Sequence, residues 1–353
     1  MLKVVRSFLL MNYKDTSMRE VENMREITYA EAIREALREE LMSDPRAFLI
    51  GEDIGAYGGA FKITDGFLKD FGPERVMDTP ISEAAIVGAA IGSALMGLRP
   101  IAEIMYMDFI PICLEQLANQ AAKMRFMSGG QLKVPIVVRT QYSLGRAHGA
   151  QHSQFLPSWF LQIPGLEVAL PSTPYDAKGL LKTAMRGSNP VLYIECSLLY
   201  RIKGPVPEGN YTIPFGQADV KRKGDDITIV AISRMVHEAM AAASALEGEN
   251  LSVEVIDPRT IQPIDIDTIV DSVKRTGRLI IAEDDSKTGG VGAEIAATVV
   301  ERAFDYLDAP IMRVAAPDIP IPFSPSLEKE YMPSKDKIIQ TIASLLGRRI
   351  TLA

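Results

Sequence analysis

The 353-residue chain is too long for one ordinary hydrophobic core, so its length favours two domains. Its residues are 47% hydrophobic and 24% charged, which is typical of a globular protein and excludes a largely disordered one. The net charge of −7 argues against nucleic acid as a main partner, because no basic field would attract phosphate groups. Apolar runs end short of about 18 residues, so no membrane span is expected.

The first 24 residues lack the periodic pattern of the rest of the chain. We interpret residues 1–24 as an extension that could be disordered, and Met24 as an alternative start. Both cysteines, Cys113 and Cys196, lie in apolar contexts, which is typical of buried thiols in a reducing compartment. We therefore expect a cytoplasmic protein.

Short β-rich runs alternate with helical patterns in the first half of the chain. Strands are expected at residues 47–51, 100–105, 134–140, 166–170 and 191–195. Helices are expected between them at residues 29–42, 82–96, 112–127 and 176–186. Nearly continuous Val, Ile and Leu in strands separated by helices predict an α/β fold, with a parallel sheet covered on both faces.

The segment 203–215 is rich in glycine and proline, so we expect it to be an irregular linker between two domains. A second alternating series follows it. Strands are expected at 227–232, 253–256, 279–282 and 311–314, and helices at 235–246, 266–274, 291–303 and 335–346. The sequence therefore predicts two doubly wound α/β domains, at residues 25–202 and 216–348.

Glu83 is the most informative single residue. It begins a helix of small apolar residues, and no further charge occurs before Arg99. Because only Gly, Ala and Ser allow such close approach of backbones, we expect the helix to be buried and the carboxyl to be shielded, which favours a specific partner for it. The alternative is an ordinary acid that complements the helix dipole, although Glu83 fits no capping-box spacing.

Apolar side chains follow the strand expected at 100–105. Met105 and Phe109 come at its carboxyl end, which is where open parallel sheets present residues to ligands. They would offer a soft apolar surface to a flat heteroaromatic ring. Ordinary core packing is the alternative for each of them.

Two of the three histidines, His148 and His152, lie in a polar loop that begins at Arg146. No third Cys or His is nearby, so a metal site is excluded there. The loop indicates general acid–base or oxyanion chemistry, with an exposed loop of no special role as the alternative. Elsewhere, the glycine-rich segment 289–295 fails the dinucleotide-binding pattern, and no phosphate-binding loop is present.

Six motifs in order resemble one family, the beta subunit of the thiamine-diphosphate-dependent decarboxylase (first) component of 2-oxo acid dehydrogenase complexes. They lie at residues 50–53, 78–83, 97–100, 151–154, 164–166 and 257–260. The similarity runs from about residue 25 to 346, and the segment 171–181 is most similar to the pyruvate and acetoin branches. The resemblance implies a pyrimidine-binding domain at 25–202 and a transketolase C-terminal-like domain at 216–348.

The resemblance also implies roles for residues of the site. Glu83 would hold the aminopyrimidine ring of thiamine diphosphate through its ring nitrogen, and Ile81, Met105 and Phe109 would wall that ring. His152 would assist substrate activation and acyl transfer to a lipoyl group. Arg146 and His148, in a loop that is usually richer in glycine, would contact the substrate carboxylate or only its rim.

Two metal ions follow from the same resemblance. A potassium site of backbone carbonyls would map to Ile136, Ala184, Met185, Gly187 and Asn189, with Gly187 in place of a usual Asp. The family holds Mg²⁺ and the diphosphate through a Gly-Asp-Gly segment followed by Asn, because Mg²⁺ prefers oxygen ligands. The nearest match here, at 224–226, lacks the second glycine. We therefore expect an alpha subunit to hold the Mg²⁺, in an alpha2beta2 heterotetramer with active sites at subunit interfaces.

The expected reaction is decarboxylation of a 2-oxo acid, chiefly pyruvate, with transfer of the acyl fragment to a lipoyl arm of an acyltransferase core. Acetoin or a branched-chain 2-oxo acid is the alternative substrate. A non-catalytic assembly subunit and a nicotinamide-dependent dehydrogenase remain as alternatives from other classes.

Overall fold

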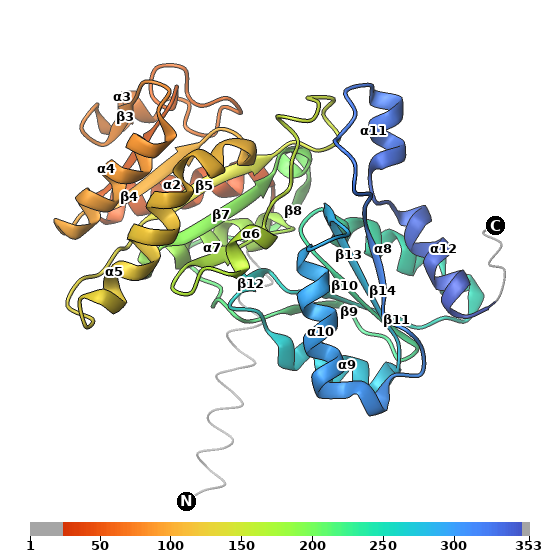
Figure 1. The fold of residues 1–353 in the computed structure, drawn as a ribbon. Helices are drawn as coiled ribbons and strands as arrows, with labels where there is room; N and C mark the ends of the chain where they lie inside the picture. The colour runs from red at the N-terminus through yellow and green to blue at the C-terminus, as the bar shows by residue number, and fades with distance from the viewer. Residues whose placement is uncertain (1–23, 348–353) are drawn as a thin grey trace, which may run out of the picture.

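The computed structural model describes residues 24–347 of the chain. These residues form two α/β halves whose sheets lie side by side, and a two-stranded ribbon joins the start of the first half to its end (Figure 1). The predicted α/β class with two doubly wound units is confirmed. The predicted extension lies, apart from Met24, outside the described residues. No helix within 24–347 is long and apolar enough to cross a membrane.

The first sheet has the order β12-β6-β7-β5-β4-β2-β3, and all of its strands except β12 are parallel. The parallel strands are β2 (Ala47–Gly51), β3 (Val76–Asp78), β4 (Arg99–Ile104), β5 (Val137–Tyr142), β6 (Glu167–Ala169) and β7 (Val191–Cys196). The chain passes from β2 outwards to β3 and then back to β4 on the other side of β2. Ligands of such sheets bind at this reversal, outside the carboxyl ends of the strands.

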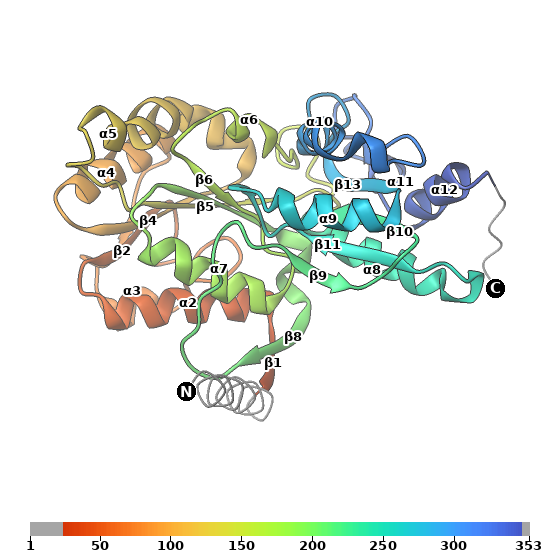
Figure 2. The same ribbon diagram turned by 90° about the horizontal axis from the view of Figure 1, so that it is seen from below.

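Helices cover both faces of the first sheet, as Figure 2 shows. On one face, α2 (Tyr29–Ser43) packs against α7 (Pro174–Arg186). On the other face lie α4 (Glu83–Leu95) and α5 (Ala122–Met127). The shorter helices of this half are α3 (Phe67–Phe71), α6 (Ser158–Leu161) and the 3₁₀ helix η3 (Ser197–Arg201).

The helix predicted over 112–127 is present from residue 114, but it is irregular. The segment folds as the 3₁₀ helix η1 (Met107–Cys113), then the π-helical turn η2 (Gln116–Ala121), then α5. Pro111 lies inside η1, and its missing N–H cannot support the hydrogen bond of a regular α-helix. Single π-helical turns are frequent at functional sites, and this one packs against α4.

The irregular linker predicted over 203–215 is wrong at its start. Strand β8 (Lys203–Pro207) pairs antiparallel with β1 (Met24–Thr28), and Ile27 lies opposite Gly204. The prolines of β8 are tolerated because each strand of a two-stranded ribbon has an unpaired edge, where a missing N–H costs nothing. The ribbon therefore ties the start of the first half to its last strand.

The second sheet has the order β14-β13-β10-β11-β9, with β9 antiparallel and the other strands parallel. Its strands are β9 (Asp219–Arg222), β10 (Ile227–Ala231), β11 (Val253–Asp257), β13 (Leu279–Ser286) and β14 (Met312–Ala316). One face carries α8 (Met235–Ala245) and α12 (Lys335–Leu345), and the other α9 (Ile266–Thr276) and α10 (Val291–Ala303) (Figure 2). Short turns are η4 (Glu247–Glu249) and η5 (Phe304–Tyr306).

The two halves share a buried interface. Strand β12 (Thr260–Gln262), from the second half, extends the first sheet by pairing with β6. The hydroxyl of Tyr142 in β5 donates to Asp284 Oδ2 in β13 at 3.0 Å. Asp176 in α7 is fully buried and accepts a hydrogen bond of 2.7 Å from Arg259 of the second half. Because these polar groups are buried and paired across the interface, each half can fix the position of loops in the other.

Candidate active site

The loop after β2 forms one wall of the carboxyl edge. Asp78, the last residue of β3, accepts hydrogen bonds from the backbone N–H groups of Gly55 at 2.5 Å and Ala56 at 2.9 Å. A side chain at Gly55 would place its Cβ 2.7 Å from an Asp78 carboxylate oxygen, so only glycine fits there. The strand end therefore holds this loop beside the start of α4.

Glu83 is the first residue of α4 and is half-buried. Within residues 24–347 its carboxylate has no hydrogen-bond partner, and the Ser82 side chain does not cap the helix. Burial, with the charges of Asp53 and Glu83, raises the pKa of Glu52 at the end of β2. Burial also raises the pKa of the Cys113 thiol to about 12, with a further contribution from Glu83. The charge of Glu83 therefore acts on groups both at the end of β2 and in η1.

The expected burial of the helix that begins at Glu83 holds for one face only. Ile86, Ala90 and Ala94 are buried on the face that packs against β4, η1 and η2. Ala89 and Gly92 on the opposite face are exposed in this chain. On that face, the predicted close packing of small residues against another backbone is therefore not seen within residues 24–347.

An aromatic wall follows β4. Tyr106 has a backbone φ of 32°, a strained value for a residue with a bulky side chain, where the strand turns into η1. Its ring lies 6.4 Å from that of Phe109 at an interplanar angle of 74°. Burial raises the pKa of the Tyr106 hydroxyl. Half-buried Met105 precedes this turn, so the predicted apolar residues do lie together at the carboxyl edge.

The histidine loop, defined here as residues 143–155, packs edge-on against this wall. The ring centroid of His152 lies 5.4 Å from those of both Tyr106 and Phe109, at angles of 88° and 82°. The ring of His148 lies 5.8 Å from Tyr106 at 89°. The buried Nδ1 of His148 has no hydrogen-bond partner among the described residues. Both histidines therefore lie beside the predicted ring-binding residues.

Other predicted residues are placed differently. Arg146 donates through Nη2 to the backbone carbonyl of Ser197 at 2.6 Å, so part of its guanidinium is committed to η3. Ile81 is 74% exposed and is open to a ligand or to another chain. Tyr106 was missed by the sequence reasoning. Its position between Met105 and Phe109 is the signal that could have identified it.

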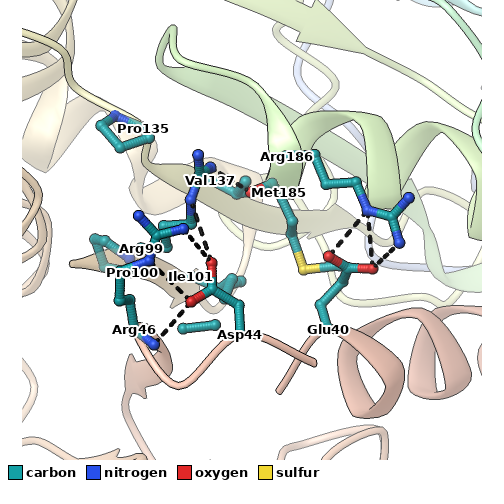
Figure 3. Close-up of a pocket in the computed structure, with 11 residues that line it drawn as sticks. Glu40, Asp44, Arg46, Arg99, Pro100, Ile101, Pro135, Val137, Met185 and Arg186 are labelled. Carbon is teal, nitrogen blue, oxygen red and sulfur yellow. Dashed lines mark hydrogen bonds and ion pairs between the residues drawn. The ribbon is translucent and has the colours of Figure 1, made fainter. Parts of the chain in front are cut away.

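The predicted potassium ligands lie at the amino edge of the first sheet, away from Glu83. Arg99 donates through Nη1 to the carbonyls of Met185 at 2.8 Å and Gly187 at 2.9 Å. Arg99 also lies near Asp44 in a cavity of about 170 Å³, which Figure 3 shows. Since a guanidinium already uses two of the five carbonyls, the donor set does not fit a potassium ion. The five predicted ligands are Ile136, Ala184, Met185, Gly187 and Asn189.

Both halves of the chain match known domain families. Residues 25–203 match the transketolase pyrimidine binding domain, and residues 216–338 match the transketolase C-terminal domain. The chain is 46% identical to the acetoin:2,6-dichlorophenolindophenol oxidoreductase subunit beta of Bacillus subtilis, over 92% of this chain and 98% of that one. It is also 46% identical to the pyruvate dehydrogenase E1 component subunit beta of Rickettsia felis, over 90% and 97%. The chain belongs to the family of beta subunits of 2-oxo acid and acetoin dehydrogenases.

A third relative of this beta-subunit family, the 2-oxoisovalerate dehydrogenase subunit beta of Bacillus subtilis, is again 46% identical, over 89% of this chain and 97% of that one. Among solved structures, a split-gene transketolase, described as an inactive beta4 tetramer, has a TM-score of 0.75 over 92% of this chain and 99% of that one. At 23% identity that structure supports the fold alone. The family resemblance is thereby confirmed, and the roles of single site residues stay predictions.

Proposed function

We propose that this chain is the beta subunit of a pyruvate dehydrogenase-type decarboxylase that passes the acyl fragment to a lipoyl group. The observation that carries the proposal is that His152 packs on the Tyr106–Phe109 wall after β4, with Glu83 at the start of the neighbouring helix α4, in a chain 46% identical to a pyruvate dehydrogenase beta subunit. The same identity to the acetoin and 2-oxoisovalerate relatives keeps those two substrates as the alternatives.

The residues at this edge fit the aminopyrimidine half of thiamine diphosphate. When bound, the cofactor would supply a thiazolium carbon that becomes a nucleophile on loss of its proton, and a ring that can take up the electrons released by decarboxylation. Glu83 would hydrogen-bond the ring nitrogen, since its half-buried carboxylate has no partner within residues 24–347. Ile81, Met105 and Phe109 would enclose the ring with apolar surface.

His152 would move protons near the substrate. Imidazole is suited to general acid–base catalysis near neutral pH, and the edge-on packing against Tyr106 and Phe109 holds its ring plane. His148, with an unpartnered buried Nδ1, is the better of the two candidates for the substrate carboxylate. Arg146 is the weaker one, because it is partly committed to Ser197.

An alpha subunit would complete the site, in an alpha2beta2 heterotetramer. It would hold the diphosphate through Mg²⁺, for which this chain lacks the Gly-Asp-Gly segment. The exposed small residues of α4, Ala89 and Gly92, and exposed Ile81 offer a surface on which another backbone could pack closely. A lipoyl acyltransferase core in the cytoplasm would accept the acyl group.

Coexpression with the alpha subunit from the same source tests the proposal. The complex is assayed with pyruvate, acetoin and a branched-chain 2-oxo acid, with a lipoylated domain as acceptor. We expect the highest kcat/KM for pyruvate, and weak binding of thiamine diphosphate by this chain alone. A preference for acetoin or the branched-chain acid would select an alternative substrate. A complex that binds no cofactor and turns over none of the three would support the assembly subunit instead.

A further inference from the structure

The short helix α11 (Pro325–Tyr331) of the second half reaches the histidine loop of the first. Figure 1 shows it beside the yellow-green loop that follows β5. The contact is made by Glu328, whose side chain is only 2% exposed. No part of the proposed chemistry requires a carboxylate on this helix, so its burial needs another reason.

Both oxygens of the Glu328 carboxylate accept hydrogen bonds from the loop backbone. Oε1 accepts from the N–H of Gly145 and Oε2 from the N–H of Ala147, each at 2.8 Å. Within residues 24–347, no ion pair involves Glu328. A carboxylate buried without a cation is costly, and hydrogen bonds to its charged form are what offset that cost. The two backbone bonds are therefore the main support of this charge.

The two donors lie in a strained turn. Gly145 has a φ of 90° and Ala147 a φ of 56°, and the second value is unfavourable for a residue with a Cβ. Such conformations persist only where surrounding contacts determine them. The Glu328 carboxylate accepts hydrogen bonds from both N–H groups and so holds the turn in this conformation. It lies more than 180 residues away in the sequence.

Residues on both sides of α11 close over the same turn. A Cβ at Gly145 would lie 3.0 Å from the methyl of Met332, and a Cβ at Gly149 would lie 3.2 Å from the ring of Phe323. The segment from Phe323 to Met332 thus touches the turn near residues 145 and 149, and Glu328 holds it between them. His148 lies within this stretch, and His152 follows it by three residues.

We propose that Glu328 is a positioning residue for the reaction. It fixes the turn 145–149 and thereby sets His148 and His152 against Tyr106 and Phe109, so that the second half determines the geometry of the site in the first. This inference rests on the proposed function, in which His152 takes part in catalysis.

The first test compares two variants with wild type in the complex with the alpha subunit. Glu328→Gln keeps the size of the side chain but loses one acceptor and its charge. Exposed Glu330→Gln on the same helix is the matched control. We expect Glu328→Gln to lower kcat by about 10- to 100-fold with an unchanged KM for thiamine diphosphate, because misplacing a catalytic group mainly affects turnover. Glu330→Gln should behave as wild type.

A double-mutant cycle with His152→Ala separates positioning from general stability. If Glu328 acts through His152, adding Glu328→Gln to His152→Ala should cost little further activity. Fully additive losses, or a wild-type kcat in Glu328→Gln, would overturn the inference. A wild-type rate in His152→Ala would count against the proposed role of His152 instead.

Hydrogen exchange of the chain itself gives a readout without activity. In Glu328→Gln the one remaining side-chain oxygen can accept from only one of the amides of Gly145 and Ala147, so the peptide covering residues 143–155 should exchange faster than in wild type and in Glu330→Gln. Equal exchange rates in all three proteins would contradict the inference, whatever reaction the complex catalyses.

Discussion

Asp108 and Gln154 join the two loops that form the candidate site. One carboxylate oxygen of Asp108 accepts from the backbone N–H of Gln154 at 3.1 Å and from its side-chain Nε2 at 2.9 Å. The first residue lies in η1, next to Phe109, and the second lies two positions after His152. The pair therefore fixes the distance between the aromatic wall and the histidine loop.

Replacement of Asp108 by alanine should detach this end of the histidine loop. We expect Asp108→Ala to lower kcat of the complex by about tenfold, since both hydrogen bonds to Gln154 are lost and His152 can shift. The exposed Asp305 provides the control variant Asp305→Ala, which should keep wild-type kinetics. Steady-state kinetics of the two variants check this. Equal kinetics in both would show that the Asp108–Gln154 pair does not position the loop.

Glu283 in β13 should make the stability of the protein depend on pH. Burial raises the pKa of its carboxyl to about 8 from an ordinary 4.5, although the N–H of Gly292 donates to it at 2.9 Å. Between these values the folded state holds a proton that the unfolded state has lost, so this contribution to stability is complete below about pH 4.5 and falls as the pH rises to 8. The buried acid is therefore most favourable when protonated.

Glu283→Gln should remove this contribution, because an amide mimics the protonated acid at every pH. Thermal unfolding at pH 5 and pH 8 measures it. We expect the drop in Tm between the two to be several degrees smaller in Glu283→Gln than in wild type or in the exposed control Glu301→Gln. A drop as large as that of wild type would mean that Glu283 is ionised in the folded protein at both pH values.

Because of Arg99, we expect the stability of the fold not to depend on potassium. Its guanidinium already bonds the carbonyls of Met185 and Gly187. We expect the same Tm in potassium and sodium buffers, and a loss of about 1–3 kcal/mol of unfolding free energy in Arg99→Met, because charged hydrogen bonds to backbone are removed. Arg46→Met is the control, since Arg46 contacts Asp44 at the surface, and should change the unfolding free energy much less than Arg99→Met.

Urea unfolding of these two variants and melting in the two buffers provide the measurements. A potassium-dependent rise in the Tm of wild type would contradict this prediction and support a potassium site at residues 136 and 184–189. A loss in Arg46→Met as large as that in Arg99→Met would show that the contact with Asp44, and not the carbonyls, carries the effect.

Much of the fold follows from local patterns. Alternating apolar strands and amphipathic helices are visible in the sequence, and the expected elements of both series are present with ends shifted by a few residues. The capping box of Thr28 and Glu31, and Thr173 before Pro174, mark helix starts in the way the sequence rules describe.

Two of the strands that were missed, β8 and β12, depend on partners distant in sequence. Strand β8 forms because β1 pairs with it across the whole first half, and β12 forms because β6 offers a free edge. No local pattern contains that information. The 3₁₀ helix η1, which precedes the helix expected at 112–127, has a local signal in Pro111.

The residues of the candidate site likewise divide into those predicted from the sequence and those identified only from the structure. The place of Glu83 at the start of α4 and of Met105 and Phe109 after β4 follows from strand and helix ends. The strained backbone of Tyr106 and the carboxylate of Glu328 over Gly145 become visible only in three dimensions. The order of motifs in the sequence predicts the reacting residues. The residues that hold them in position are identified only from tertiary contacts.

The central claim is that the Glu83 carboxylate binds the cofactor ring, and the rate of pyruvate decarboxylation by the Glu83→Gln complex tests it most directly. The exposed Glu74→Gln is the control. The account predicts that Glu83→Gln assembles normally with the alpha subunit but is slower by about 100-fold or more, while Glu74→Gln keeps the wild-type rate. An assembled Glu83→Gln complex with wild-type turnover would contradict the account.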